Sequence, residues 1–469
     1  MRLPDGPVTW PGDKDVGRYF LDLSRERQWA LRRVETISFL DERRVERKVS
    51  LDVDLELLRE AAVRAALIPE SSDDLGETLL PVPIVLLAKG TLVDLDVSDA
   101  NGRSLSVALS SVDSAVASAL LCALLDENSL LNTAHIRDLV YAIANDETES
   151  TLADLVRFIE GGQPTATGSG PQEADRAAWR SIADNPEAAD FLSQFATRFM
   201  LICQLAYEPR VVTVKYRYVE TTKPPDRRRF WDRLGVGSMP LQVSVPGLGY
   251  ARSEHIRVDA PPGATIEDPT LSRETATTSG STFAVTASKD RYRSRPTLDR
   301  AVFHTRVATG GDYRVSLAVR SEPNVFYHPA LLASALGLLL FGFGAALDVA
   351  NVLSGTNLEI NSDAAVAVLA ISISLLAVYA AVGSEHGLIS RLLFWPRLFV
   401  AISAAVGLLA AGAVVIDSEL RWLFLCSGAI YNLLLVGLLI AGLTTSAVSR
   451  RETQRLNERE VEIVDEPES

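Results

Sequence analysis

Four long apolar stretches near the C-terminal end are the clearest feature of the hydrophobic pattern. They contain no Asp, Glu, Lys or Arg, and they cover residues 329–347, 364–383, 398–416 and 422–443. About 20 apolar residues in a helix cross the hydrocarbon core of a bilayer, so each stretch is long enough for one crossing. A soluble domain of this size could not bury four such helices on all sides. The pattern therefore predicts a four-helix transmembrane region.

Basic residues beside these stretches predict the orientation, because Lys and Arg are retained on the cytoplasmic side. Arg391 and Arg397 lie between the second and third stretches, whereas residues 348–363 carry acidic residues and no basic one. A charged tail with several Arg, residues 449–469, follows the fourth stretch. Residues 1–19 contain no apolar core of the length that a signal peptide needs. We therefore expect a multi-pass protein of the cell membrane whose N-terminal region and tail are both cytosolic.

Before residue 329 the pattern predicts helices and strands in turn. An amphipathic pattern predicts a helix over residues 13–33, within an N-terminal region of residues 1–33. Apolar and polar residues alternate from Val49 to Leu55, as in a half-buried strand, and residues 37–40 are placed to form a hairpin with it. A β segment opens at Val82, and a second hairpin turns at Asn101 and Gly102. Further helices are predicted over 57–67, 112–126, 133–145, 151–160, 173–184 and 187–205.

These elements predict two cytosolic domains before the membrane region. Residues 34–207 form an α+β unit, interrupted by a flexible loop rich in Gly, Ser, Thr and Pro at 161–171. Residues 208–325 have short strands between Pro and Gly turns, which predicts a small β-sandwich-like domain. The sequence leaves open whether 34–207 is one domain or two. The predicted strands of the second domain are 211–220, 241–245, 254–259, 282–287, 301–308 and 313–319.

The composition argues against some partners and compartments. A net charge of −14 and a pI near 5.0 argue against a nucleic-acid partner, because phosphate binding needs clustered Lys and Arg. The three cysteines lie far apart in the sequence, which excludes a CxxC metal site and fits a reducing compartment. Only six of the 46 basic residues are Lys, a bias typical of GC-rich genomes.

No familiar catalytic or cofactor motif is present. The chain has no Gly-x-Ser-x-Gly elbow and no Walker A sequence. His255 and His304 fall in predicted strands of one domain and could approach each other, although a structural role is the commoner one for such residues. The acidic run before Gly102 resembles a calcium loop, but Val97 and Ala108 occupy positions that require carboxylates. We therefore expect no catalytic, cofactor-binding or metal site, and a site assembled from distant residues stays a further alternative.

Two sets of residues are candidates for contacts in or at the membrane. Three consecutive Arg and one Trp in the 222–237 segment suit the anionic inner leaflet, and the alternative is a solvated hairpin loop. Small residues spaced by four in the third span allow close helix packing, and one Asn near the centre of the fourth span suits an interhelical hydrogen bond better than a pore. The first set is Arg227, Arg228, Arg229 and Trp231, and the second is Ser403, Gly407, Ala411 and Asn432.

Two segments carry a resemblance to other proteins. ETISFLDERRVERKVS, from Glu35 to Ser50, and HIRVDAPPGA, from His255 to Ala264, resemble segments of uncharacterised actinobacterial integral membrane proteins. The resemblance implies a cytosolic N-terminal region before the membrane helices, and it implies no activity.

The leading functional hypothesis is a membrane-anchored, non-enzymatic protein that senses, scaffolds or interacts through its cytosolic domains. One alternative is an effector whose four spans oligomerise after a cytosolic signal and perturb the bilayer, because the third and fourth spans have small-residue faces. The other is an enzyme whose site is not recognisable from sequence. The expected partners are the lipid bilayer, anionic lipid, further copies of the chain through the transmembrane helices, and a protein partner of unknown kind.

Overall fold

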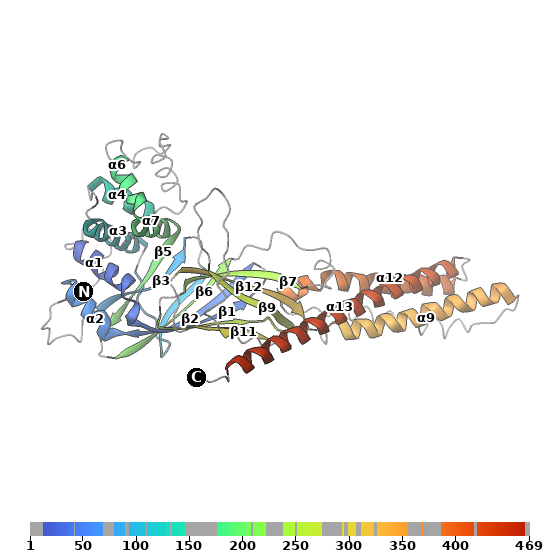
Figure 1. The fold of residues 1–469 in the computed structure, drawn as a ribbon. Coiled ribbons are helices and arrows are strands. Elements are labelled where there is room, and N and C mark those ends of the chain that lie inside the picture. The colour runs from blue at the N-terminus through green and yellow to red at the C-terminus, as the bar shows by residue number, and fades with distance from the viewer. Residues whose placement is uncertain are drawn as a thin grey trace.

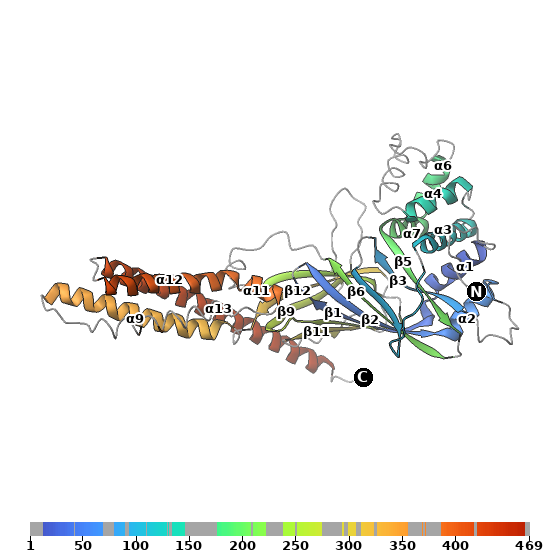
Figure 2. The same cartoon turned by 180° about the vertical axis from the view of Figure 1, so that it is seen from behind.

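The described part of the chain is elongated, with sheets and a cap of helices at one end and three long helices extending from the other (Figure 1). Figure 2 shows the same arrangement from behind. The computed structural model describes residues 13–41, 43–68, 79–89, 93–108, 110–128, 130, 134–145, 176–207, 210–221, 238–248, 251–273, 293–294, 299–305, 311–322, 326–354, 368, 371, 386–416 and 420–464.

The alternating pattern around Val49 forms the hairpin that the sequence predicts. Strands β1 (Ala30–Phe39) and β2 (Arg44–Asp54) pair antiparallel, and their odd-numbered residues form a largely buried face. The hairpin is the centre of a seven-stranded sheet of order β10-β11-β8-β1-β2-β6-β4, in which β8 runs parallel to β1. The other strands are β4 (Val93–Asp99), β6 (Val211–Thr221), β8 (Ser253–Asp259), β10 (Arg293–Ser294) and β11 (Arg300–Thr305).

A three-stranded sheet, of order β7-β12-β9, packs against the end of the larger sheet that lies nearer the long helices (Figure 1). It consists of β7 (Met239–Leu248), β9 (Ala264–Arg273) and β12 (Gly311–Ser321). Its apolar residues share one core with Ile37 and Val45 of the hairpin.

The strands do not follow the boundary expected between residues 207 and 208. Strands β6 and β8 come from the second predicted unit, yet they flank the β1–β2 hairpin of the first. Local periodicity identifies a strand but not its partner, because a strand's preference depends on the neighbours against which it packs. The seven-stranded sheet therefore joins the two predicted domains.

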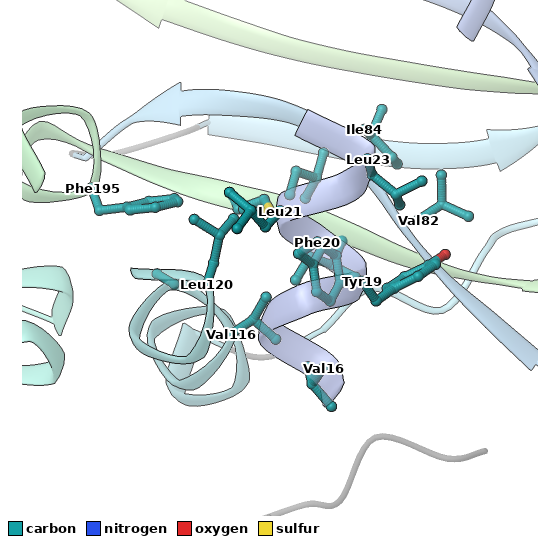
Figure 3. Close-up of a cluster of buried hydrophobic side chains, with 14 of the residues drawn as sticks. Val16, Tyr19, Phe20, Leu21, Leu23, Val82, Ile84, Val116, Leu120 and Phe195 are labelled. Carbon is teal, nitrogen blue, oxygen red and sulfur yellow. The ribbon is translucent and has the colours of Figure 1, made fainter. Parts of the chain in front are cut away.

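A cap of helices covers the remaining sheet at the end far from the long helices (Figure 1). This two-stranded sheet pairs β3 (Leu79–Ala88) with β5 (Arg198–Ala206). Figure 3 shows side chains of α1 between the strands and α3, with Leu23 near Ile84 and Leu21 toward Leu120. Helix α1 approaches α3 so closely that a Cβ at Gly17 would lie 2.1 Å from the Ala119 carbonyl oxygen. The helices are α1 (Asp13–Arg25), α2 (Leu55–Arg64), α3 (Ser110–Glu127), α4 (Ala134–Asn145), α6 (Arg176–Asp184) and α7 (Pro186–Thr197).

Two predicted helices end earlier than expected. The first, expected over 13–33, stops at Arg25, and β1 already begins at Ala30. The helix expected over 187–205 stops at Thr197, and the apolar run that follows is strand β5. Such short continuous apolar runs cannot be assigned to helix or strand by periodicity alone. Strand β9 was not expected at all, and the predictions at 151–160, 161–171 and 282–287 lie outside the described residues.

Three helices of the described part are long and apolar enough to cross a membrane. They are α9 (Tyr327–Ser354), α12 (Phe394–Val415) and α13 (Arg421–Val464), and their candidate spans are 22 to 24 residues long. Their outer surfaces are strongly apolar: Leu339 is 70% exposed and Phe343 68% exposed. A surface of this kind needs lipid or another apolar partner. The second predicted span, 364–383, lies outside the described residues except for Val368 and Ile371.

Candidate functional site

An apolar cavity of about 400 Å³ lies in the helical cap, between α1, β3, α7 and β5. The cavity is partly open to solvent, because the exposed side chains of Arg25 and Glu187 stand at its edge. It lies within the range of volumes of small-molecule sites, which are mostly apolar with a few polar groups. The apolar lining residues include Phe20, Leu23, Trp29, Ile84, Leu86, Leu120, Phe191, Phe195 and Met200.

Charged side chains on α1 and α7 form one side of the cavity. Arg25 of α1 donates from Nε and Nη2 to the Glu187 carboxylate of α7, at 2.9 and 3.0 Å, and from Nη1 to Glu127 of α3 at 2.6 Å. The Arg25 and Glu187 side chains are 38% and 41% exposed, and exposed ion pairs contribute only about 0 to 1 kcal/mol. This ion pair links two walls of the cavity, and breaking it costs little free energy.

The opposite side reaches a layer of buried charges on the seven-stranded sheet. Arg33 lines the cavity, and its Nη2 donates to Glu35 at 2.5 Å. The other Glu35 oxygen accepts from Nη1 of Arg47 at 2.5 Å, and Arg47 Nε donates to Glu220 at 2.6 Å. Arg47 Nη2 also donates to the Ser244 carbonyl of β7. A chain of charge-assisted hydrogen bonds thus runs from the cavity to the three-stranded sheet.

The sequence places this charge layer on the same face as the apolar core. On β1, Arg33 and Glu35 have the same parity as Ile37 and Phe39, so strand alternation turns all four side chains to one side. Arg47 is likewise in line with the apolar residues of β2 and is fully buried. The charges lie between two hydrophobic clusters, one under the helical cap and one toward the membrane helices. These buried charges were not predicted from the sequence, although charged residues at inward positions of a strand indicate them.

The membrane-facing end of the sheet is packed against the helical bundle. Helix α11 (Gly387–Leu392) precedes α12, and its Leu388 and Ile389 are fully buried in the core shared with the sheets. The His386 Nε2–H donates to the Phe39 carbonyl at the end of β1, at 2.6 Å. We call these contacts of residues 386–393 with the hairpin the junction. The soluble region therefore meets the bundle through packed side chains and not only through the chain connection before α9.

Inside the bundle, two of the predicted packing residues are in contact. The Ser403 hydroxyl of α12 donates to the Asn432 amide oxygen of α13 at 2.8 Å, and both residues are fully buried. Gly407 and Ala411 are buried on the same helix as Ser403. A Cβ at Gly337 of α9 would lie 2.9 Å from the Asn432 oxygen, so the absent side chain lets α9 approach this pair. Asn432 thus lies where the three described helices meet.

The remaining predicted site residues divide into two groups. His255 and His304 do come together, with ring centroids 4.2 Å apart, and burial and His304 lower the pKa of His255. No group of three or more metal-ligating side chains occurs among the described residues. The basic aromatic set, Arg227, Arg228, Arg229 and Trp231, lies outside the described part.

Comparison with known proteins gives no information about the function. The sequence matches no family model and no curated protein. The apolar cavity is the candidate functional site because it has the volume of a small-molecule site and the polar group of Arg33 in its wall.

Proposed function

We propose that this is a membrane-anchored, non-enzymatic sensing protein whose soluble region binds a small, mostly apolar molecule. The cavity of about 400 Å³ carries the proposal. A water molecule occupies about 30 Å³ in the liquid, so a ligand of roughly a dozen non-hydrogen atoms would fill this space. The elements that line the cavity, α1, β3, α7 and β5, lie at the end of the soluble region away from the long helices, so the ligand arrives from the aqueous side (Figure 1).

The charge layer favours an uncharged ligand with a hydrogen-bond acceptor. Arg33 and Arg47 pair with the carboxylates of Glu35 and Glu220, and the buried Glu254 lies opposite Arg33 in the register of β1 and β8. When all are ionised, the layer already carries one excess negative charge. A ligand carboxylate would add a second to a buried site, where an uncompensated charge costs several kcal/mol. A carbonyl or hydroxyl oxygen adds none, and we expect it to be held near Arg33.

The junction supports the sensing part of the proposal. A ligand in the cavity would contact Arg33, which lines it. The hydrogen bonds of Glu35 and Arg47 connect Arg33 with β7. The core that contains β7 also contains Leu388 and Leu392 of the junction. A soluble region on a flexible linker would lack such a connection.

We place the soluble region and the end of α13 on the cytosolic side of the cell membrane. Arg391 and Arg397 lie at the sheet end of the bundle, as retention of basic residues in the cytoplasm favours. Helices α9 and α13 are antiparallel, because Asp348 pairs with Arg421 at one end and Gly442 lies against Tyr327 at the other. Ser354 and His386 therefore lie at opposite ends of the bundle, and the sequence predicts the second span between them. A reporter after Ser469 that is active only outside the cell would refute this orientation.

The binding experiment uses the full chain in lipid nanodiscs and three probes of equal length: decane, methyl octyl ketone and decanoate. Hydrogen exchange of α7 amides is measured with each. The ketone should slow exchange about tenfold at a concentration near ten times its Kd, and decanoate should have the smallest effect. Ala251→Phe, which fills the cavity, should abolish the protection, and Ala30→Leu is a second filling variant. Protection that persists in both folded variants would refute the cavity as the site.

The same samples test sensing. Cys426 on α13 is half-buried, whereas Cys122 and Cys203 are buried, so a fluorophore can be attached to it selectively. We expect the ketone to change its emission in the wild-type chain and not in Ala251→Phe. Protection of α7 without any response at Cys426 would leave a binding protein but remove the sensor. Leakage of a dye from cells that express the protein would instead favour the effector alternative.

A further inference from the structure

A second pocket lies at the junction, and its lining is charged where that of the cavity is apolar. It is open, has a volume of about 430 Å³, and is formed by three parts of the chain that are distant in sequence: the turn between β1 and β2, the end of β6, and α11. Its lining residues are Asp41, Arg43, Arg44, Thr221, Gly387 and Arg391.

Local hydrogen bonds hold both walls of this pocket in place. The Asp41 carboxylate accepts the backbone N–H groups of Arg43 and Arg44, each at 2.8 Å, and Arg44 Nε at 2.7 Å. On the other wall, the bond from His386 to the Phe39 carbonyl fixes the start of α11 beside the hairpin. The guanidinium groups of the hairpin turn and of α11 are thereby presented by two fixed elements.

The pocket carries an excess of positive charge. Three arginines line it together with one carboxylate, and that carboxylate is engaged with Arg44. Arg43 and Arg391 are both exposed. Guanidinium groups suit phosphate oxygens, because their planar array of donors matches the geometry of the anion.

The pocket lies at the membrane surface, because Arg391 is close in sequence to the start of a candidate span. Arg391 precedes the candidate span Phe394–Val415 by three residues. Phe394 and Trp395, at the start of that span, are 56% and 42% exposed. Aromatic residues of this kind are enriched at the level of the lipid headgroups. A phosphate bound by Arg391 would therefore lie where the headgroups of the adjacent leaflet lie.

We propose that this pocket binds the phosphate of an anionic phospholipid, through Arg43, Arg44 and Arg391. Basic pockets beside transmembrane helices hold such headgroups by charge attraction at short range. The occupant is a lipid and not free phosphate, because the acyl chains keep the headgroup at the level of the pocket. The site is separate from the apolar cavity and does not depend on the sensing function.

The test measures lipid affinity by native mass spectrometry on the detergent-purified full chain. Phosphatidylglycerol and phosphatidylcholine of the same acyl length are titrated separately, with and without inorganic phosphate. The wild-type chain should bind phosphatidylglycerol about tenfold more tightly or better. Arg43→Gln with Arg391→Gln should remove most of that preference, and the two lysine substitutions at these positions should keep most of it.

The matched control is Lys14→Gln with Arg64→Gln, which makes the same change in net charge on exposed side chains of α1 and α2. This variant should bind phosphatidylglycerol as the wild type does. An equal loss in the control would mean that net charge alone acts, and an unchanged preference in the pocket variant would overturn the site. Displacement of the lipid by inorganic phosphate would assign the pocket to the free anion. Each single substitution is measured too, so that one misfolded double variant does not decide the result.

Discussion

In the seven-stranded sheet, Arg47 is fully buried and its guanidinium ion contacts two carboxylates; in the membrane bundle, Asn432 is equally buried and its amide contacts a hydroxyl. Both residues are polar, and both make hydrogen bonds to buried neighbours. The buried groups around Arg47 are ions, and one of the carboxylates, Glu220, is still 28% exposed, whereas the groups that meet at Asn432 are neutral. The ion pair of the described bundle, between Asp348 and Arg421, lies at the far end of the helices.

The difference follows from the two surroundings. An ion at the centre of a bilayer is costly and has few neighbours that could compensate it. A neutral amide needs only its hydrogen bonds, and interhelical bonds of this kind contribute about 1 kcal/mol. In the sheet, several partners of opposite charge are brought together by strand pairing. We therefore expect large effects when a charge is removed from the sheet and small effects when a polar group is removed from the bundle.

Removing Arg47 should have the largest effect. In Arg47→Met the carboxylates of Glu35 and Glu220 lose their shared partner, and breaking a buried ion pair from one side costs about 3 to 5 kcal/mol. The loss is measured as the free energy of opening from native-state hydrogen exchange of β1 and β2. Arg64→Met, which breaks an exposed pair with Glu26, should cost at most about 1 kcal/mol. Similar losses in the two variants would mean that the buried layer is well hydrated.

The stability of the soluble region should depend on pH through another buried acid, Asp113 on α3. Burial raises its pKa from 3.8 to about 7, although it accepts the Met200 backbone N–H at 2.8 Å. The folded state therefore binds this proton more tightly than the unfolded state, and stability falls as pH rises from about 4 to about 7. Asp113→Asn keeps an acceptor for Met200 and removes the titration. It should stabilise the soluble region at pH 8 by up to about 4 kcal/mol, since each pKa unit corresponds to about 1.4 kcal/mol.

The check is thermal melting of both proteins across this pH range. At about pH 4, where Asp113 is protonated in the folded state, the two melting temperatures should converge. An advantage of Asp113→Asn that is the same at every pH would show that ionisation of Asp113 is not its cause.

The smallest effect is expected in the bundle. Asn432→Leu removes the hydrogen bond from Ser403 and should cost about 1 kcal/mol or less, measured by unfolding in lipid. Ser403→Ala removes the same bond from the other side and should cost a similar amount. Neither substitution should change ion flux through proteoliposomes. A change in flux at equal protein level would mean that Asn432 lines a pathway and does not only pack.

The sequence predicted the local features well and the pairing of distant segments poorly. Apolar length identified the three described spans to within a few residues, because a membrane helix needs little beyond its own composition. The β1–β2 hairpin was also predicted, since its strands are adjacent in the chain. The parallel pairing of β1 with β8 and the burial of Glu35 beside Arg47 depend on contacts between distant segments. For the same reason the cavity was not predictable, because its walls come from α1, β3, α7 and β5.

The junction makes the sheets and the adjoining end of the bundle one packed unit. A Cβ at Gly387 would lie 3.6 Å from the Cβ of Asp41, within the range of disulfide bonds. The measurement is oxidative cross-linking of the Asp41→Cys, Gly387→Cys variant in native membranes, with the bond mapped by mass spectrometry. The pair Gly102→Cys, Gly387→Cys is the control, because nothing lies within 4 Å of a Cβ at Gly102. We expect nearly complete cross-linking of the first pair and none of the second. Two reactive but unlinked thiols at positions 41 and 387 would contradict this packing.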